Sequence, residues 1–188
     1  MIKKNIISIT IALFSIFIIS CSGNSKFTIE KGKVGKITTK TKMMELATIF
    51  KNDSIVKNLS EGAQGDNYFQ EDDEYFVYEK GGKLLLTIMP KEQLDSTSTI
   101  KSIEIHDSRF ETESGINLNS SFSQINANNN INKVESTFSS ATLFIHELNA
   151  TVVIDKEELG LKEFSPEKVS LEQIPDLAKM KSFIIWFQ

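Results

Sequence analysis

The sequence has very little cysteine and histidine: one cysteine, Cys21, and two histidines, His106 and His146, in 188 residues. A single thiol cannot form an intramolecular disulfide, and a zinc site needs three or four nitrogen or sulfur ligands. Neither a His-Glu-x-x-His pattern nor a Gly-x-Ser-x-Gly elbow occurs. The acidic residues between Asp66 and Glu74 lack the spacing of an EF-hand loop. These absences predict a protein with no metal, no cofactor and no enzymatic activity.

Two enzymatic alternatives stay open at this point. His106 and Asp107 are adjacent, and serine is abundant, so a serine hydrolase is conceivable. Neighbouring residues of a strand point to opposite faces of a sheet, however, so Asp107 is poorly placed to orient His106. Acidic residues are also plentiful enough to supply the two carboxylates of a glycoside hydrolase of the envelope, although abundance alone is no signal.

Hydrophobic runs are short, and the longest one lies at the N-terminus. Lys3 and Lys4 precede an apolar core at residues 6–19, which is shorter than the ~20 residues that a helix needs to span a bilayer. A positive head, a short apolar core and small residues after it are typical of a signal peptide. We therefore predict a signal peptide at residues 1–20.

The apolar core ends in Ile18-Ile19-Ser20-Cys21, which resembles the lipobox of bacterial lipoproteins. The resemblance implies that the Cys21 sulfur takes a diacylglycerol, that cleavage occurs before Cys21, and that the new amine receives a fatty acid such as palmitate. An ordinary secretory signal is the alternative, but lipidation explains why the only cysteine stands here. We expect a lipidated tether at residues 21–32, followed by one domain at residues 33–188.

The residues after Cys21 bear on location. In Gram-negative lipoproteins an aspartate next to the cysteine resembles a signal for the inner membrane, whereas this chain has Ser22, and its first acidic residue is Glu30. We predict the periplasmic face of the outer membrane. Loss of residues 1–20 removes two lysines and no acid, which changes the net charge from −4 to −6. We therefore expect no nucleic acid partner, and contact with the membrane through the lipid alone.

Strand patterns dominate the predicted domain. Two β-rich runs, residues 74–80 and 83–89, flank Gly81-Gly82, which is a strong hairpin signal. A second hairpin is expected around Asn149. The remaining expectations are strands at residues 33–39, 100–106 and 181–187, helices at 42–51 and 122–127, a helix or strand at 54–59, and an asparagine-rich loop at 126–132. We predict an α+β fold: a mainly antiparallel sheet of about six or seven strands with two or three short helices, in a single domain. Because residues 183–187 are very apolar, Trp186 is expected to be buried.

Several pieces of the chain resemble one known family. They are Val34-Gly35-Lys-Ile37-Thr38, Ile100-Lys-Ser-Ile103-Glu-Ile105-His-Asp107, Gly115-Ile116-Asn-Leu118, Ser121-Phe122-Ser123 and Lys181-Ser-Phe-Ile184-Ile185-Trp186. Together they are similar to the sigma-E-regulated envelope lipoproteins of enterobacteria, which carry a domain of unknown function. The resemblance spans most of residues 34–188, but the acidic loop and the asparagine-rich loop differ. It implies a role in envelope maintenance or stress, and it offers no catalytic residues.

Candidate contact residues lie in the polar stretch after the third strand, where Arg109 and Phe110 stand out. Arginine and aromatic residues are enriched at interface hot spots, so both could contact an envelope protein partner. The alternative is a connecting loop with Phe110 in the core. Five aromatic residues around the first hairpin are likewise either core residues or the lining of a groove: Tyr68, Phe69, Tyr75, Phe76 and Tyr78. Our hypothesis is a non-catalytic, membrane-anchored periplasmic lipoprotein that acts through protein contacts. The alternative is a lipid- or glycan-binding carrier, which a cavity lined by Phe and Tyr would favour.

Overall fold

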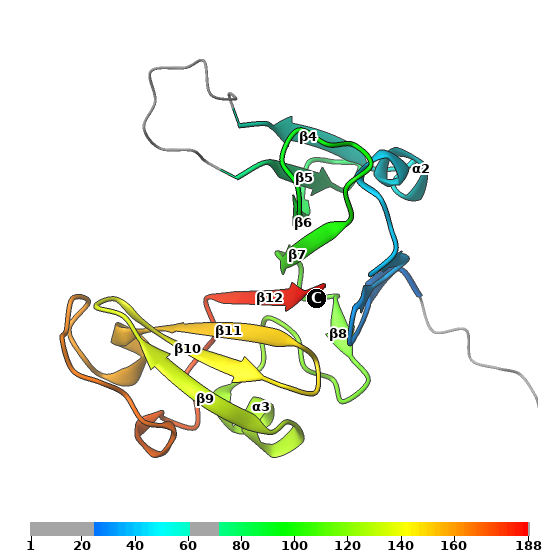
Figure 1. Ribbon diagram of the computed structural model, residues 1–188. Coiled ribbons are helices and arrows are strands. Elements are labelled where there is room, and N and C mark those ends of the chain that lie inside the picture. The colour runs from blue at the N-terminus through cyan, green and yellow to red at the C-terminus, as the bar shows by residue number, and fades with distance from the viewer. Residues whose placement is uncertain (1–24, 61–71, 188) are drawn as a thin grey trace, which may run out of the picture.

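The computed structural model describes residues 25–60 and 72–187, and across these residues it contains twelve strands and two α-helices. The predicted signal peptide, Cys21 and most of the acidic loop lie outside the described residues. Within the described part, no helix is both long and apolar enough to cross a membrane. The strands form two sheets, which share one hydrophobic core. Figure 1 shows the arrangement of the strands and helices.

The larger sheet has eight antiparallel strands in the order β4-β5-β6-β7-β12-β11-β10-β9. Strand β12 comes last in the chain but lies in the middle of the sheet, between β7 and β11 (Figure 1). It therefore joins two halves that are each built from consecutive strands. The strands are β4 (Ser54–Asn58), β5 (Glu74–Tyr78), β6 (Leu84–Pro90), β7 (Ile100–Ile105), β9 (Ile131–Ser136), β10 (Ser140–Ile145), β11 (Ala150–Asp155) and β12 (Ser182–Trp186).

The smaller sheet has four short strands in the order β3-β2-β1-β8. They are β1 (Thr28–Glu30), β2 (Lys33–Val34), β3 (Ile37–Thr38) and β8 (Glu111–Thr112), and β1 runs parallel to β8. The helical elements are α2 (Leu46–Ile49), α3 (Phe122–Asn128) and the 3₁₀ turns η1 (Ser25–Phe27), η2 (Met43–Glu45), η3 (Lys156–Leu159) and η4 (Leu171–Gln173). Helix α3 begins after Ser121, whose backbone N–H donates to the Gln124 side chain at 2.9 Å.

The core follows from the alternation of apolar residues along the strands. In β12, Phe183 and Ile185 are fully buried while Ile184 and Trp186 are half-buried, because successive residues face opposite sides of the sheet. One continuous cluster of buried side chains runs from Ile29 in the smaller sheet to the C-terminal strand. The prediction that Trp186 is buried was therefore wrong: the apolar run is buried on alternate residues only.

Most of the predicted elements are confirmed. The hairpin at Gly81-Gly82 joins β5 to β6, and the hairpin at Asn149 joins β10 to β11. Helix α3 and strands β7 and β12 lie where they were expected, and residues 54–58 form a strand. The expected count of six or seven strands was wrong. No strand was predicted at β1, β8 or β9, the first residues of β9 were assigned to the asparagine-rich loop, and β2 and β3 were predicted as one strand.

The folded domain also begins earlier than the predicted boundary at residue 33. Ile29 is only 1% exposed, and β1 is hydrogen-bonded between β2 and β8. The predicted tether at residues 21–32 is thus too long, because residues 25–30 already form η1 and β1.

Candidate functional site

One face of the larger sheet packs on the core, and the opposite face, which we call the outer face, is only partly covered. A single row of cross-strand partners follows this face through all eight strands: Val56, Phe76, Thr87, Glu104, Ile184, Thr151, Phe144 and Lys133. Val56 is 52% exposed, and Phe76, Ile184 and Phe144 are half-buried. The row thus carries an aromatic ring near each end, Phe76 and Phe144, with polar side chains and Ile184 between them.

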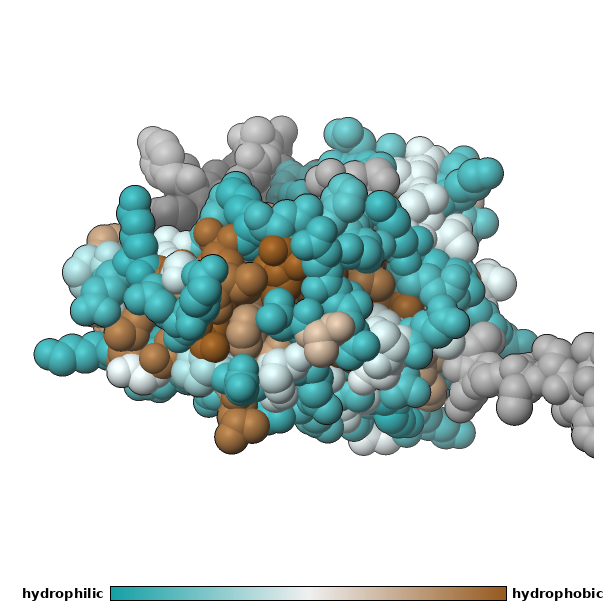
Figure 2. Space-filling view, turned by 90° about the horizontal axis from the view of Figure 1, so that it is seen from below, coloured by the Kyte–Doolittle hydropathy of each residue, from teal (hydrophilic) through white to brown (hydrophobic). Residues whose placement is uncertain are grey.

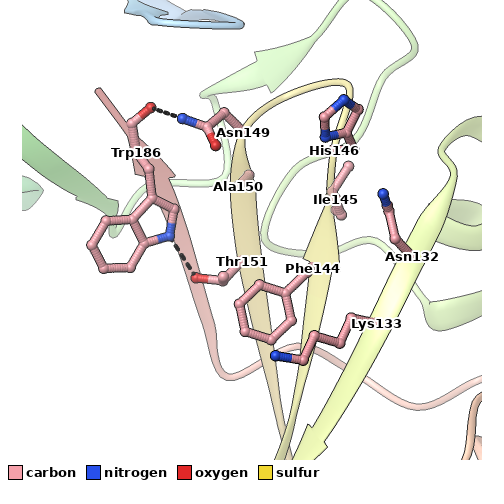
Figure 3. Close-up of a pocket in the computed structure, with 9 residues that line it drawn as sticks. All are labelled: Asn132, Lys133, Phe144, Ile145, His146, Asn149, Ala150, Thr151 and Trp186. Atoms are coloured by element: carbon pink, nitrogen blue, oxygen red, sulfur yellow. Dashed lines mark hydrogen bonds between the residues drawn. The ribbon is translucent and has the colours of Figure 1, made fainter. Parts of the chain in front are cut away.

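An open groove with a volume of about 480 Å³ lies over the β9–β12 end of the outer face. Its main side chains are drawn in Figure 3: Asn132 and Lys133 from β9, Phe144 from β10, His146 and Asn149 from the β10–β11 turn, Thr151 from β11 and Trp186 from β12. The described residues that line this groove include no carboxylate. Aromatic rings beside amides and a hydroxyl can bind by stacking and hydrogen bonding, but this set supplies no acid–base pair.

Hydrogen bonds fix Trp186 in this groove. Its indole N–H donates to Thr151 Oγ1 at 3.1 Å, and its backbone carbonyl accepts from the Asn149 side-chain amide at 2.9 Å (Figure 3). The Trp186 backbone N–H in turn donates to the Asn149 carbonyl at 2.8 Å. Asn149 has a φ of +50°, a conformation that asparagine tolerates better than most residues. The hairpin turn and the tryptophan are therefore held in one arrangement before any partner binds.

Phe144 on β10 lies directly across from Thr151 on β11 and from Lys133 on β9. The Lys133 ammonium is 5.2 Å from the centre of the Phe144 ring and also pairs with Glu135. This side chain covers part of the ring, while the ring stays accessible from the groove in Figure 3.

A polar cluster occupies the middle of the outer face. Thr87 Oγ1 lies 2.8 Å from His106 Nε2, and Ser182 Oγ donates to Glu104 Oε1 at 2.6 Å. The same Nε2 atom is 3.8 Å from Glu104 Oε2. The serine is therefore bonded to the carboxylate and not to the imidazole, which is the wrong order for a nucleophile, a base and an orienting acid. No group of three or more metal-ligating side chains is found among residues 25–60 and 72–187.

The two residues predicted as partner contacts behave differently from that prediction. Phe110 is 1% exposed, and its ring meets the Phe27 ring edge-on with centroids 5.0 Å apart. Phe110 is therefore a core residue, and its assignment as a partner contact was wrong. The Arg109 guanidinium stacks 4.4 Å from the centre of the Phe27 ring and is bonded to two carboxylates of its own chain.

Arg109 belongs to an ion cluster around the buried carboxylate of Asp107. Arg109 Nε and Nη2 donate to Asp107 at 3.0 and 2.7 Å, while Nη1 and Nη2 donate to Glu79 at 3.0 and 2.8 Å. Lys83 approaches Asp107 at 2.8 Å. The hydrogen bonds from Arg109 hold the pKa of Asp107 well below its usual range, although burial opposes this shift. The cluster fastens the segment after β7 to the β5–β6 hairpin.

The acidic loop ends in a second buried carboxylate. Asp73 accepts hydrogen bonds from the Ser60 backbone N–H and hydroxyl at 2.8 Å and from the Leu94 N–H at 2.6 Å. Burial raises the pKa of Asp73, but these hydrogen bonds outweigh it, so the net shift is downward. Asp73 is therefore a buried and hydrogen-bonded carboxylate that links Ser60 to Leu94.

Sequence reasoning missed the groove because its residues are far apart in the chain. The possible aromatic groove was placed at the first hairpin, but Tyr75 is in the core, and Phe76 and Tyr78 are half-buried on the outer face. Tyr68 and Phe69, the other two members of that cluster, lie outside the described residues. The signal that could have revealed the site is the alternation in β10 and β12. That alternation sends Phe144 and Trp186 away from the core.

A further apolar surface lies elsewhere. Figure 2, which views the molecule from below, shows apolar side chains gathered within a polar surround. Leu177, Phe164 and Phe138 are the most exposed large apolar residues. The Ser165 N–H donates to the Phe138 carbonyl at 2.9 Å, so the β9–β10 turn lies beside the segment before β12.

No family model and no curated protein matches the chain. Among solved structures, the chain is similar to the crystal structure of the uncharacterized protein yfeY from Escherichia coli. The identity is 16%, the match covers 86% of this chain and 99% of that chain, and the TM-score is 0.49. This likeness carries no argument about function.

Proposed function

We propose that the protein is a non-catalytic lipoprotein of the bacterial envelope, anchored through Cys21 at the periplasmic face of the outer membrane, that binds a protein partner through its outer face. The observation that carries the proposal is the preformed groove around Trp186. The resemblance to sigma-E-regulated envelope lipoproteins supports a role in envelope maintenance or stress.

The shape and lining of the groove favour a partner surface over a catalytic cleft. Interfaces are enriched in tryptophan, phenylalanine and tyrosine, which combine a large apolar area with few rotatable bonds. Trp186 and Phe144 supply such area, and hydrogen bonds hold the tryptophan in place, so little side-chain entropy is lost on binding.

Photo-crosslinking in living cells tests this proposal. A benzophenone amino acid replaces Phe144 in one protein and Phe164, which is 71% exposed and lies off the outer-face row, in a matched control. We expect a discrete crosslinked protein from position 144 and none from position 164. Adding Trp186→Ala should reduce the crosslink at least severalfold, because it removes the largest ring of the groove. Equal crosslinking from both positions, or none from position 144, would contradict the proposal.

The alternative, a glycan-binding module, is favoured by one specific observation: two aromatic rings stand beside the side-chain amides of Asn132 and Asn149. Trp186 is the only tryptophan, so its fluorescence reports on the groove directly. A saturable change in emission on titration with cell-wall glycan fragments, together with no crosslinked protein, would replace the protein partner by a glycan. An enclosed cavity would suit an acyl-chain carrier better than this open groove does.

The anchor has its own prediction. Cys21→Ser should leave an unprocessed precursor or a species released from the membrane, because no other residue can carry the thioether. Mass spectrometry of the wild-type N-terminus should show a triacylated Cys21. An unmodified mature N-terminus at any other residue would refute the lipid anchor without affecting the groove.

A further inference from the structure

Charge is unevenly distributed along the domain. Residues 25–60 contain eight lysines and three acids, a net charge of +5, although the chain from Cys21 onward has a net charge of −6. The remaining residues therefore carry −11. The average charge, from which we expected the domain to avoid anionic lipid, hides a basic segment directly after the predicted anchor.

The fold gathers part of this basic segment beside the point where the described chain begins. Lys26, Lys36 and Lys51 line one hollow of about 120 Å³. Gly35 is what allows this approach, since a Cβ atom there would lie 2.5 Å from the Lys26 carbonyl oxygen. Its own N–H donates to the Thr28 carbonyl at 2.8 Å, which holds β1 and β2 in register.

Two of these three lysines form no ion pair with the described residues. Lys26 pairs with Asp53 at 3.1 Å, and the neighbouring cluster of Arg109 and Lys83 is matched by Glu79 and Asp107. Lys36 and Lys51 are exposed and have no acidic partner among the described residues. The excess positive charge at this face therefore resides on these two side chains.

The length of the tether decides what this face meets. If Cys21 is acylated, only Cys21, Ser22, Gly23 and Asn24 separate the lipid from Ser25. Four residues reach at most about 14 Å, so the N-terminal face of the domain stays within one or two Debye lengths of the headgroups. A lipid chain combined with basic residues is a common two-part membrane attachment.

We propose that Lys36 and Lys51 bind the headgroups of anionic phospholipids and thereby orient the domain on its membrane. Both side chains line the same hollow as Lys26. This inference rests on the proposed lipid anchor at Cys21. Figure 1 shows the N-terminal strands and α2 on the same side of the molecule.

The test uses the full lipidated protein, purified from membranes and incorporated into vesicles of phosphatidylcholine, with or without about one third phosphatidylglycerol. Thr48→Cys, an exposed position in α2, gives a unique thiol for a dye because the Cys21 sulfur is blocked. Energy transfer to a labelled headgroup should be at least twofold higher on the anionic vesicles, and about 0.5 M salt should abolish the difference. Lys36→Glu with Lys51→Glu should remove it as well.

The matched control is Lys162→Glu with Lys168→Glu, which makes the same charge change at exposed positions outside residues 25–60. This variant should keep the full response. Equal transfer on neutral and anionic vesicles, or equal loss in both double variants, would overturn the proposal. If mass spectrometry shows an unmodified Cys21, the anchor has failed. Sedimentation of the same protein with anionic vesicles then decides the basic face: binding lost in Lys36→Glu with Lys51→Glu supports it, and no binding overturns it.

Discussion

Phe110→Ala is expected to lower the free energy of unfolding by about 3–5 kcal/mol, which is the usual range for removing a buried phenylalanine ring. Phe110 is among the largest fully buried side chains, and it packs edge-on against Phe27. Its loss would leave a cavity and would also release the ring on which Arg109 stacks. Urea unfolding followed by circular dichroism measures the change.

The control for this substitution is Phe164→Ala. Phe164 is exposed, so its removal should change the free energy of unfolding by less than about 0.5 kcal/mol. If Phe110→Ala were equally neutral, the ring would have to lie at the surface, and the idea of Phe110 as a partner contact would return.

Asp107→Asn should have the second largest effect, a loss of about 2–3 kcal/mol. Removing one partner of a buried ion pair typically costs about 3–5 kcal/mol, but Arg109 and Lys83 are partly exposed and can regain water, which lowers the cost. Glu79→Gln is the matched control, since it removes only the more exposed carboxylate of the same cluster and should have a clearly smaller effect.

The pH dependence of unfolding gives an independent check on Asp107. Because its pKa is lowered in the folded protein, the unfolded chain binds more protons once the pH falls below the ordinary aspartate pKa of about 3.9. The contribution of Asp107 is therefore complete at neutral pH and declines as the pH falls below about 4. The stability difference between wild type and Asp107→Asn should shrink in that range. A difference that stays constant down to pH 2.5 would contradict this account.

The fold was predictable where the pattern is local. Gly81-Gly82 and Asn149 mark tight turns by their own conformational preferences, and both hairpins follow from the β-rich runs beside them. The two-residue strands β2, β3 and β8 are too short to show an alternation of apolar residues, and β8 is defined by its pairing with the distant strand β1. The position of β12 in the sheet could not be predicted from its own residues either, because tertiary packing determines that it pairs with β7 and β11.

The candidate site was predictable only in part, for a related reason. Residue type marked Arg109 and Phe110 as distinctive, but type alone does not tell a buried ring from an exposed one. The two rings of the groove, Phe144 and Trp186, come from strands 42 residues apart in sequence. Only the register across β10, β11 and β12 brings them over one surface.

The central place of β12 has a consequence for biogenesis. Strands β4 to β7, and likewise β9 to β11, can pair with their sequence neighbours as the chain leaves the ribosome. The remaining edges of β7 and β11 can pair only once residues 182–186 have been made. The larger sheet cannot close before those residues have been made, and such long-range pairing slows folding. Under our proposal that the protein is translocated, this order keeps the chain competent for translocation until residues 182–186 have been made. A truncation before Ser182 would leave two half-sheets, each with an unpaired edge open to aggregation.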